Sequence, residues 1–166
     1  MWVLNEEQVY NPAPLKTAEL IKEDLNNVGV NVTIRSVTRT FLIDQLNKKS
    51  ENYDMILTGW LAGNLDPDSF MRPILSCNSA SEMTNLSNWC DEDFDQLMDK
   101  ALDSPNLWER AHAYNQAQEL ILSKLPIVPL ANMKRVLVVN SRVRHIEMNP
   151  FGSLNFSTLS LRKGEK

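Results

Sequence analysis

The fold is decided by residues 15–34, LKTAELIKEDLNNVGVNVTI. The apolar residues of its first part recur at helical spacing: Leu20, Ile21, Leu25 and Val28. This stripe predicts a helix over residues 15–28. Gly29 is placed to end that helix, because glycine accepts the left-handed conformation common at helix C-termini. Residues 30–34 then alternate with period two and are rich in β-branched side chains, so they predict a strand.

The flanking segments continue this alternation of strands and helices. Residues 2–4 predict a strand before the helix. After it, Thr40 is a candidate N-cap for a short helix over residues 41–48, and residues 54–60 predict another buried strand. Strands and helices alternating at these lengths require right-handed crossovers, so we predict the α/β class with a mainly parallel sheet.

The pattern becomes helical after residue 69. Residues 69–75 predict one or two turns, and the acidic run that begins at Asp91 suits the first turn of a helix. Ser104 is the expected N-cap of a longer helix with Pro105 in its first position, ended by Pro126. The expected core stripes of these two helices are Phe94, Leu97, Met98 and Ala101, then Trp108, Ala111, Tyr114, Gln118 and Ile121. Residues 127–130 and 136–139 are expected to be extended.

Charge divides the chain into two parts. Residues 1–131 carry 10 Lys and Arg against 19 Asp and Glu, whereas residues 132–166 carry 7 basic and 2 acidic residues. The acidic body argues against nucleic-acid binding by counterion release, and the basic end is interpreted as part of a different packing unit. No apolar run reaches the roughly 20 residues of a membrane span. No secretory signal is visible before the strand at residues 2–4, so upstream sequence is expected to be missing.

Cys77 and Cys90 flank a polar segment. Either they are two buried free thiols, or they form a disulfide that closes a short surface loop. Metal binding would need more ligands at closer spacing, and the two histidines, His112 and His145, lie far along the chain, so no metal site is predicted.

Asp66 and Asp68 lie in a turn, DPD, which follows the strand predicted over residues 54–60 after five intervening residues. A hydrolase centre or a calcium loop would need further partners that the sequence does not supply. We therefore expect Asp66 to shape the turn and Asp68 to cap the following helix. Because the nucleotide-binding and nucleophile motifs are also absent, we predict a protein that is not an enzyme and has no cofactor. The loop that includes residues 61–66 would lie beyond the carboxyl end of a parallel strand, where α/β proteins bind ligands.

The chain resembles the periplasmic peptide-binding proteins of ABC importers, the dipeptide/oligopeptide-binding family. The resemblance rests on segments that occur in the same order over almost the whole chain: NPAPLKTAELI from residue 11, GW at 59–60, DPDSF at 66–70, LSC at 75–77, NLSNWCD at 85–91, YNQAQ at 114–118, LPIVPL at 125–130 and PFG at 150–152. It implies two α/β lobes that enclose a ligand. Residues 1–131 would form part of the C-terminal lobe, and residues 132–166 would return toward the N-terminal lobe.

The resemblance also implies a Cys77–Cys90 disulfide, location in a Gram-negative periplasm, and an inner-membrane ABC permease as partner. The ligand is expected to be a peptide or a haem-like molecule, since the most similar branch of the family is associated with antimicrobial-peptide resistance and haem uptake. The expected ligand-binding residues are Trp60, Leu61, Ala62, Gly63 and Asn64, with Arg39 and Asn11 from the other strand-to-helix loops. Trp60 would form an apolar wall of the site or pack on the sheet.

One position departs from the family pattern. The third residue after the tryptophan is commonly an aspartate that pairs with the peptide's α-ammonium, and here it is Gly63. An unpaired buried ammonium costs several kcal/mol, so amine-end capture is predicted to be weak or absent. Backbone pairing with an extended ligand would remain. The alternative hypotheses are a hydrolase that uses Asp66 and Asp68, and a protein-interaction module that acts through the basic C-terminal segment.

Overall fold

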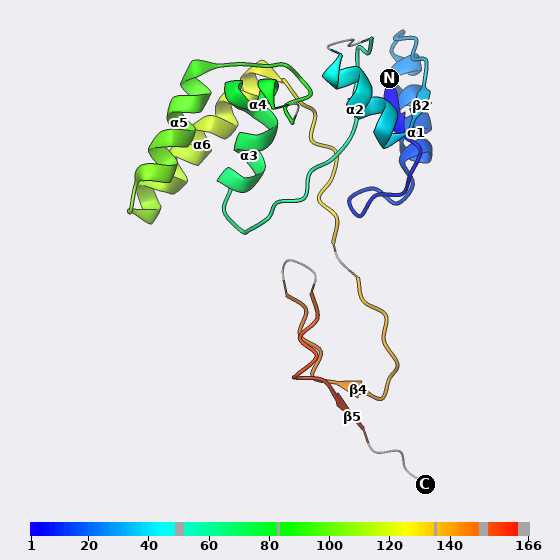
Figure 1. Cartoon of the computed structure of the whole chain (residues 1–166), viewed down its shortest axis with the longest axis vertical. Coiled ribbons are helices and arrows are strands. Elements are labelled where there is room, and N and C mark those ends of the chain that lie inside the picture. Colours follow the sequence, from blue (N-terminus) through cyan, green and yellow to red (C-terminus); the bar gives the residue numbers. More distant parts are fainter. Residues whose placement is uncertain (49–51, 83, 135, 150–152, 163–166) are drawn as a thin grey trace.

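The computed structural model describes residues 1–48, 52–82, 84–134, 136–149 and 153–162. Figure 1 shows a sheet region and a group of helices side by side, with the C-terminal part extending below them as a thin arm. In these ranges no helix is long and apolar enough to cross a membrane. The PFG motif at 150–152 lies outside the described residues.

Three short strands form the sheet in the order β2-β1-β3. The strands are β1 (Trp2–Leu4), β2 (Arg35–Val37) and β3 (Ile56–Leu57). Val3 of the central strand lies opposite Ser36 on one side and Leu57 on the other, and both pairings are parallel. The predicted α/β class with a parallel sheet is therefore confirmed.

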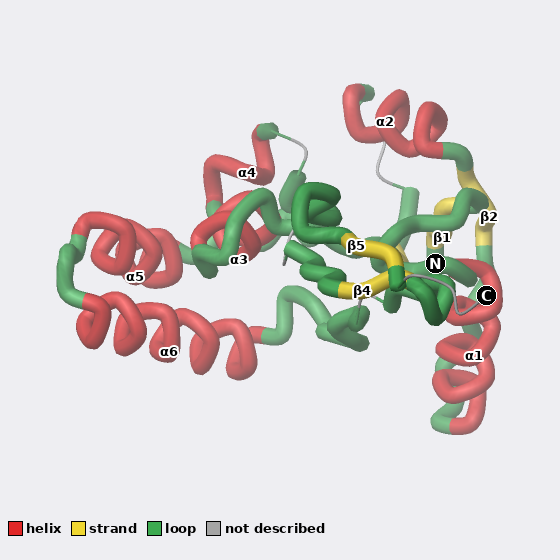
Figure 2. Tube along the Cα trace, turned by 90° about the horizontal axis from the view of Figure 1, so that it is seen from below, coloured by secondary structure: helices red, strands yellow, loops and turns green. Residues whose placement is uncertain are grey.

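One helix packs on each face of the sheet. Along β1, Val3 clusters with Ala18 of α1 (Pro14–Asn27), whereas Trp2 and Leu4 cluster with residues of α2 (Arg39–Asn47). Figure 2 shows α1 and α2 on opposite sides of the strands. Because successive strand side chains point to opposite faces, both faces of β1 are buried and all three of its residues are apolar.

The boundaries of three predicted elements are wrong. The strand predicted over residues 30–34 lies instead at Arg35–Val37, because β1 begins at Trp2 and its first partner is Arg35. The strand predicted over 54–60 is reduced to Ile56–Leu57. The N-cap of α2 is Thr38 rather than Thr40, since the Thr38 hydroxyl accepts the amide of Phe41 at 3.1 Å.

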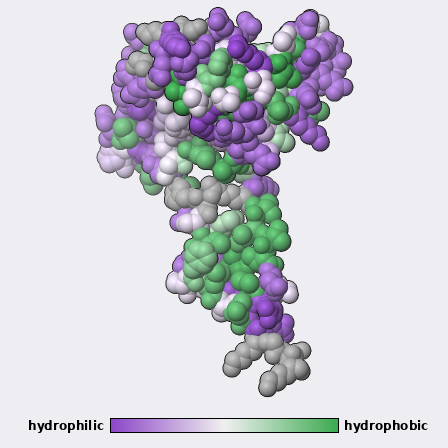
Figure 3. All heavy atoms as spheres, turned by 45° about the vertical axis from the view of Figure 1, so that its right-hand side comes forward, coloured by the Kyte–Doolittle hydropathy of each residue, from purple (hydrophilic) through white to green (hydrophobic). Residues whose placement is uncertain are grey.

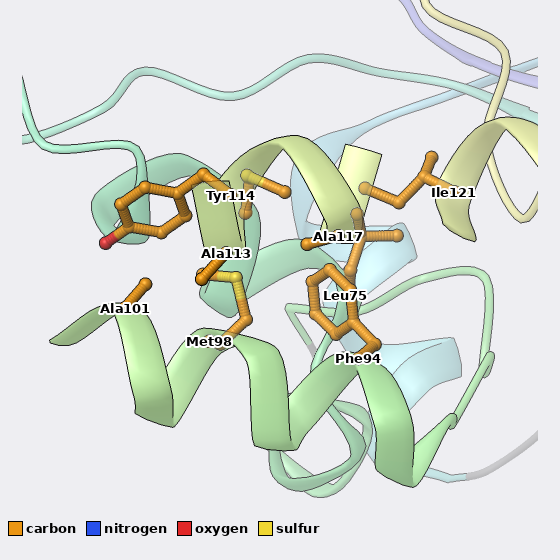
Figure 4. Packing of buried hydrophobic residues seen from close by; sticks show 9 residues of the cluster. Leu75, Phe94, Met98, Ala101, Ala113, Tyr114, Ala117 and Ile121 are labelled. Atoms are coloured by element: carbon orange, nitrogen blue, oxygen red, sulfur yellow. The ribbon is translucent and has the colours of Figure 1, made fainter. Parts of the chain in front are cut away.

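Four helices form the second packed unit: α3 (Asp68–Leu75), α4 (Cys77–Ser81), α5 (Glu92–Asp103) and α6 (Leu107–Lys124). Figure 4 shows buried side chains of three of these helices packed together, with Leu75 from α3, Phe94 and Met98 from α5, and Tyr114 and Ile121 from α6. The predicted stripe on α5 is confirmed, because Phe94, Met98 and Ala101 are fully buried. Asp91 caps α5 by accepting the amides of Asp93 and Phe94.

The start of α6 and part of its core face differ from the prediction. Ser104 ends α5, and Asn106 is the N-cap of α6, with its Oδ1 accepting the Trp108 amide at 2.9 Å. Trp108 is 73% exposed, while Ala113 and Ala117 are buried. Of the other residues in the predicted stripe, Tyr114 and Ile121 are buried, whereas Ala111 and Gln118 are exposed. The small side chains of Ala113 and Ala117 face α5 instead and allow the two helices to approach closely.

Cys77 and Cys90 form a disulfide with an S–S distance of 2.11 Å. It joins the first residue of α4 to the segment before α5. The disulfide alternative is confirmed, and the alternative of two free thiols is wrong.

In the C-terminal arm, which begins at residue 132, β4 (Val143–Arg144) pairs antiparallel with β5 (Ser160–Leu161), and most of the other described residues are irregular. Figure 3 shows hydrophobic side chains gathered on this arm. Val136 and Val138 are 83% and 91% exposed, and Phe156 is 74% exposed.

Candidate ligand-binding site

The three parallel strands bring three loops to one edge of the sheet. The loop after β1 contains Asn11, the segment after β2 leads into Arg39, and the loop after β3 contains residues 58–67. Ligands in open α/β sheets bind beyond the carboxyl ends of such strands. The predicted ligand residues lie on the loops at this edge, except Arg39, which is the first residue of α2.

Two contacts join these loops to one another. The guanidinium of Arg39 donates from Nη2 to Oε1 of Gln8 at 2.8 Å. On the other side, Gly59 lies against the ring of Tyr10, so that an added Cβ would be 2.4 Å from Tyr10 Cδ2. Tyr10 and Gln8 were not predicted, because nothing in the local sequence indicates which loop each one meets.

Trp60 opens the loop after β3 and is half-buried. Its indole Nε1 donates to the carbonyl oxygen of Ser69 at 3.0 Å, which ties the start of the loop to α3. Leu61, Ala62 and Gly63 follow and are exposed. These three consecutive residues are therefore accessible to solvent.

The side-chain oxygens of Asn64 and Asn11 accept hydrogen bonds from residues close to them in the sequence. Asn64 Oδ1 accepts the amide of Asp66 at 2.8 Å. Asn11 Oδ1 accepts the Ala13 amide and the Thr17 hydroxyl, each at 3.2 Å, and so supports the start of α1. Both asparagines therefore shape the loops at this edge.

Gly63 is open to solvent on its side-chain face. A Cβ added there would meet nothing within 4 Å. Gly63 is not among the residues with a left-handed backbone. The backbone therefore does not require glycine at the position where the resemblance leads us to expect an aspartate.

Asp66 is held by side chains of α6. Its Oδ1 accepts the Tyr114 hydroxyl at 2.9 Å and the Asp68 amide at 3.0 Å, while its Oδ2 forms an ion pair with Arg110. The backbone hydrogen bond from Asp68, followed by the Tyr114 hydroxyl and the Arg110 charge, outweighs burial and lowers the pKa of Asp66. Burial and the hydrogen bond to Asp66 raise the pKa of Tyr114 to about 12.

The predicted role of Asp66 in the turn is confirmed, but the predicted role of Asp68 is wrong. Pro67 occupies the N-cap position of α3 and Asp68 is its first helical residue. Its carboxylate accepts from Nε of Arg72 at 2.8 Å rather than from a backbone amide. The proline ring favours the helical φ that Pro67 adopts here, so the helix begins one residue earlier than expected.

This geometry does not suit a hydrolase. A general acid at neutral pH needs a raised pKa, whereas the pKa of Asp66 is lowered and both aspartates are in ion pairs. His112 lies on the exposed side of α6, stacked on Trp108 with 5.5 Å between ring centroids. Within the described ranges, no group of three or more His, Cys, Asp or Glu residues is arranged to hold a metal ion.

Residues 2–82 match the family model described as bacterial extracellular solute-binding proteins, family 5 Middle. Over 159 residues the chain is 66% identical to the peptide transport periplasmic protein SapA of Haemophilus influenzae. It is 40% identical over 166 residues to SapA of Salmonella typhimurium. This chain belongs to the family 5 solute-binding proteins.

Solved structures of family 5 relatives share the fold. The dipeptide-binding protein of Pseudoalteromonas sp. SM9913, in complex with Met-Leu, superposes with a TM-score of 0.79 at 35% identity over 97% of this chain. HbpA2 of Haemophilus parasuis gives a TM-score of 0.78 at 30% identity, also over 97%. These likenesses support the predicted lobe of a two-lobed binding protein as the fold.

The chain spans only part of each relative's length. It covers 28% of the Haemophilus influenzae protein and 30% of the Salmonella typhimurium protein. It covers 31% of each of the two solved structures.

Proposed function

We propose that this chain forms the ligand-binding part of one lobe of a periplasmic solute-binding receptor for a peptide-type ABC importer. The observation that carries the proposal is the convergence of three loops at the carboxyl edge of the parallel sheet, with the exposed residues 61–63 between fixed ends. Among the relatives, SapA of Haemophilus influenzae is described as a peptide transport periplasmic protein, and the Pseudoalteromonas protein is a dipeptide-binding protein in complex with Met-Leu. The function is binding and delivery to a permease, with no catalytic step.

The proposal assigns residues 1–131 to the ligand-binding lobe and residues 132–166 to a segment that packs against the other lobe. The apolar side chains on the C-terminal arm support this division, since exposed groups such as Val138 and Phe156 need a covering surface. The ligand would be enclosed between the two lobes.

Residues 60–65 of the loop after β3 include no carboxylate that could pair with a peptide amine. Gly63 has no side chain, and both carboxylate oxygens of Asp66 already accept hydrogen bonds from α6. Amine-end capture is therefore weak in this receptor, and the ligand is held through its backbone or through apolar contacts. Antimicrobial peptides and haem, the ligand classes that the family resemblance implies, are the two further ligands we propose.

Calorimetry on the two-lobed protein tests the proposal with four probes: Met-Leu, N-acetyl-Met-Leu, a cationic amphipathic peptide and haem. We expect at least one probe to bind, and blocking the amine of Met-Leu to change its Kd by less than about threefold, below 1 kcal/mol. A loss of about a hundredfold on acetylation would show that the amine is captured after all. The absence of binding to all four probes would contradict the proposed function.

A further inference from the structure

The loop of residues 60–65 bridges the two packed units of the chain. At its start, Gly59 lies against Tyr10 in the loop after β1. At its end, the Asp66 carboxylate is bound by Arg110 and Tyr114 of α6. The position of the exposed residues between these two contacts therefore depends on both contacts.

Arg110 is itself held by four groups, one of which is the Tyr114 hydroxyl, which accepts from its Nη2 at 3.4 Å. Its Nη2 pairs with Asp66, while its Nη1 donates to the carbonyl oxygens of Ala101 at 2.7 Å and Leu102 at 3.3 Å. These carbonyls belong to the last turn of α5, where helix acceptors have no partner within the helix. The side chain is 18% exposed, so its position is determined by α5 as much as by the loop.

The Tyr114 hydroxyl donates to Oδ1 of Asp66, and the tyrosine ring lies in the core. It is 5% exposed and belongs to the cluster between α5 and α6, so its hydroxyl reaches Asp66 from a rigid side chain. The Arg110 guanidinium lies 5.6 Å from the centre of the Tyr114 ring. Arg110 and Tyr114 are one helical turn apart on α6 and approach the carboxylate together.

We infer that Arg110 and Tyr114 are positioning residues for ligand binding, which act through Asp66 to hold the loop of residues 60–65 in its binding geometry. This inference rests on the proposed function. A loop that is ordered before the ligand arrives loses less conformational freedom on binding, and the affinity is correspondingly higher. The α5–α6 unit thus contributes to binding without touching the ligand.

Tyr114→Phe in the two-lobed protein is the test, since it removes one hydroxyl and keeps the buried ring. Tyr53→Phe is the matched control, because its hydroxyl is also partly buried and donates to the Leu86 carbonyl at 2.9 Å, away from the loop. Three quantities are measured for each variant: the free energy of unfolding in urea, hydrogen exchange of the backbone amides of residues 61–66 and 68, and the Kd of whichever of the four probes the unsubstituted protein binds most tightly.

We expect Tyr114→Phe to speed exchange in residues 61–66 and 68 and to weaken probe binding by about tenfold, and Tyr53→Phe to do neither even where it lowers stability. Asp66→Asn should weaken binding similarly. The double variant Asp66→Asn/Tyr114→Phe should be little worse than either single change, because the residues act as one unit.

Each contrary outcome has a distinct meaning. If the unsubstituted protein binds no probe, the proposed function is wrong and the inference is lost with it. If it binds but Tyr114→Phe binds equally well, or if both tyrosine variants lose affinity in proportion to stability, the positioning role alone is wrong.

Discussion

Gly59 and the ring of Tyr10 are in such close contact that a single added carbon on Gly59 would lie 2.4 Å from Cδ2 and 2.7 Å from Cγ of the ring. Only glycine allows the loop after β3 to lie this close to the loop after β1. The contact fixes the beginning of the proposed ligand edge.

Gly59→Ala is therefore expected to displace the Tyr10 ring and to lower the free energy of unfolding by about 1–3 kcal/mol. Urea unfolding measures the loss, and adding Tyr10→Ala should recover part of it. The control is Gly63→Ala, whose new Cβ meets nothing within 4 Å, with an expected change within about 0.5 kcal/mol. Equal losses for the two alanine variants would mean that the Tyr10 contact does not constrain Gly59.

Gly63→Asp should create capture of a peptide amine. The side chain has room, and a carboxylate there would pair with an ammonium at the ligand edge. Calorimetry should show affinity for Met-Leu rising by about tenfold or more, equivalent to 1.4 kcal/mol, with no gain for N-acetyl-Met-Leu. Gly63→Asn is the control without charge, and a gain of the same size in that variant would exclude charge pairing as the cause.

The Cys77–Cys90 disulfide closes a short loop, with a sequence separation of 13. Replacing both residues with alanine should lower the free energy of unfolding by about 3 kcal/mol, because the unfolded chain gains freedom. Urea unfolding of the oxidised protein and of the double variant gives the difference. A reducing agent should destabilise only the protein that retains the cysteines, and no effect on either would contradict the prediction.

The raised pKa of Tyr114 predicts a loss of stability at alkaline pH. The folded protein holds the phenol proton to about pH 12, whereas the unfolded chain releases it near 10. The protonated Tyr114 phenol therefore contributes fully to the free energy of unfolding below pH 10, and this contribution is lost as the pH rises toward 12. Tyr114→Phe should lack this decline and Tyr53→Phe should retain it, as measured by urea titrations at several pH values.

The lowered pKa of Asp66 predicts the opposite dependence in acid. Its carboxylate stabilises the fold above the unfolded pKa of 3.8, and this stabilisation is lost as the pH falls through the lower folded value. In Asp66→Asn, the free energy of unfolding, measured by urea titrations at several pH values, should fall less steeply below pH 4 than in the unsubstituted protein. If the variant and the unsubstituted protein decline in parallel there, Asp66 does not contribute through its charge.

The α/β class, the parallel sheet and the disulfide could be expected from the sequence and its family resemblance, whereas element boundaries were less predictable. A strand was expected over residues 30–34, but the structure has it at Arg35–Val37. The pairing with β1 sets this position, because Trp2, the first residue of β1, lies opposite Arg35. Likewise, Trp108 is exposed, whereas Ala113 and Ala117 are buried in the core. Which side chains of α6 are buried depends on how closely α5 and α6 approach each other.

By itself, the sequence determined that Gly63 lacks a side chain and that Asp66 and Asp68 flank a proline. Only the tertiary structure decided what the carboxylates do, since Arg110 and Tyr114 lie 44 and 48 residues from Asp66. Periodicity describes neighbours along one helix or strand and is silent on such distant pairs. Folding brings α6 against the loop, and an acidic residue that the sequence could assign only to a turn becomes the anchor of the proposed ligand edge.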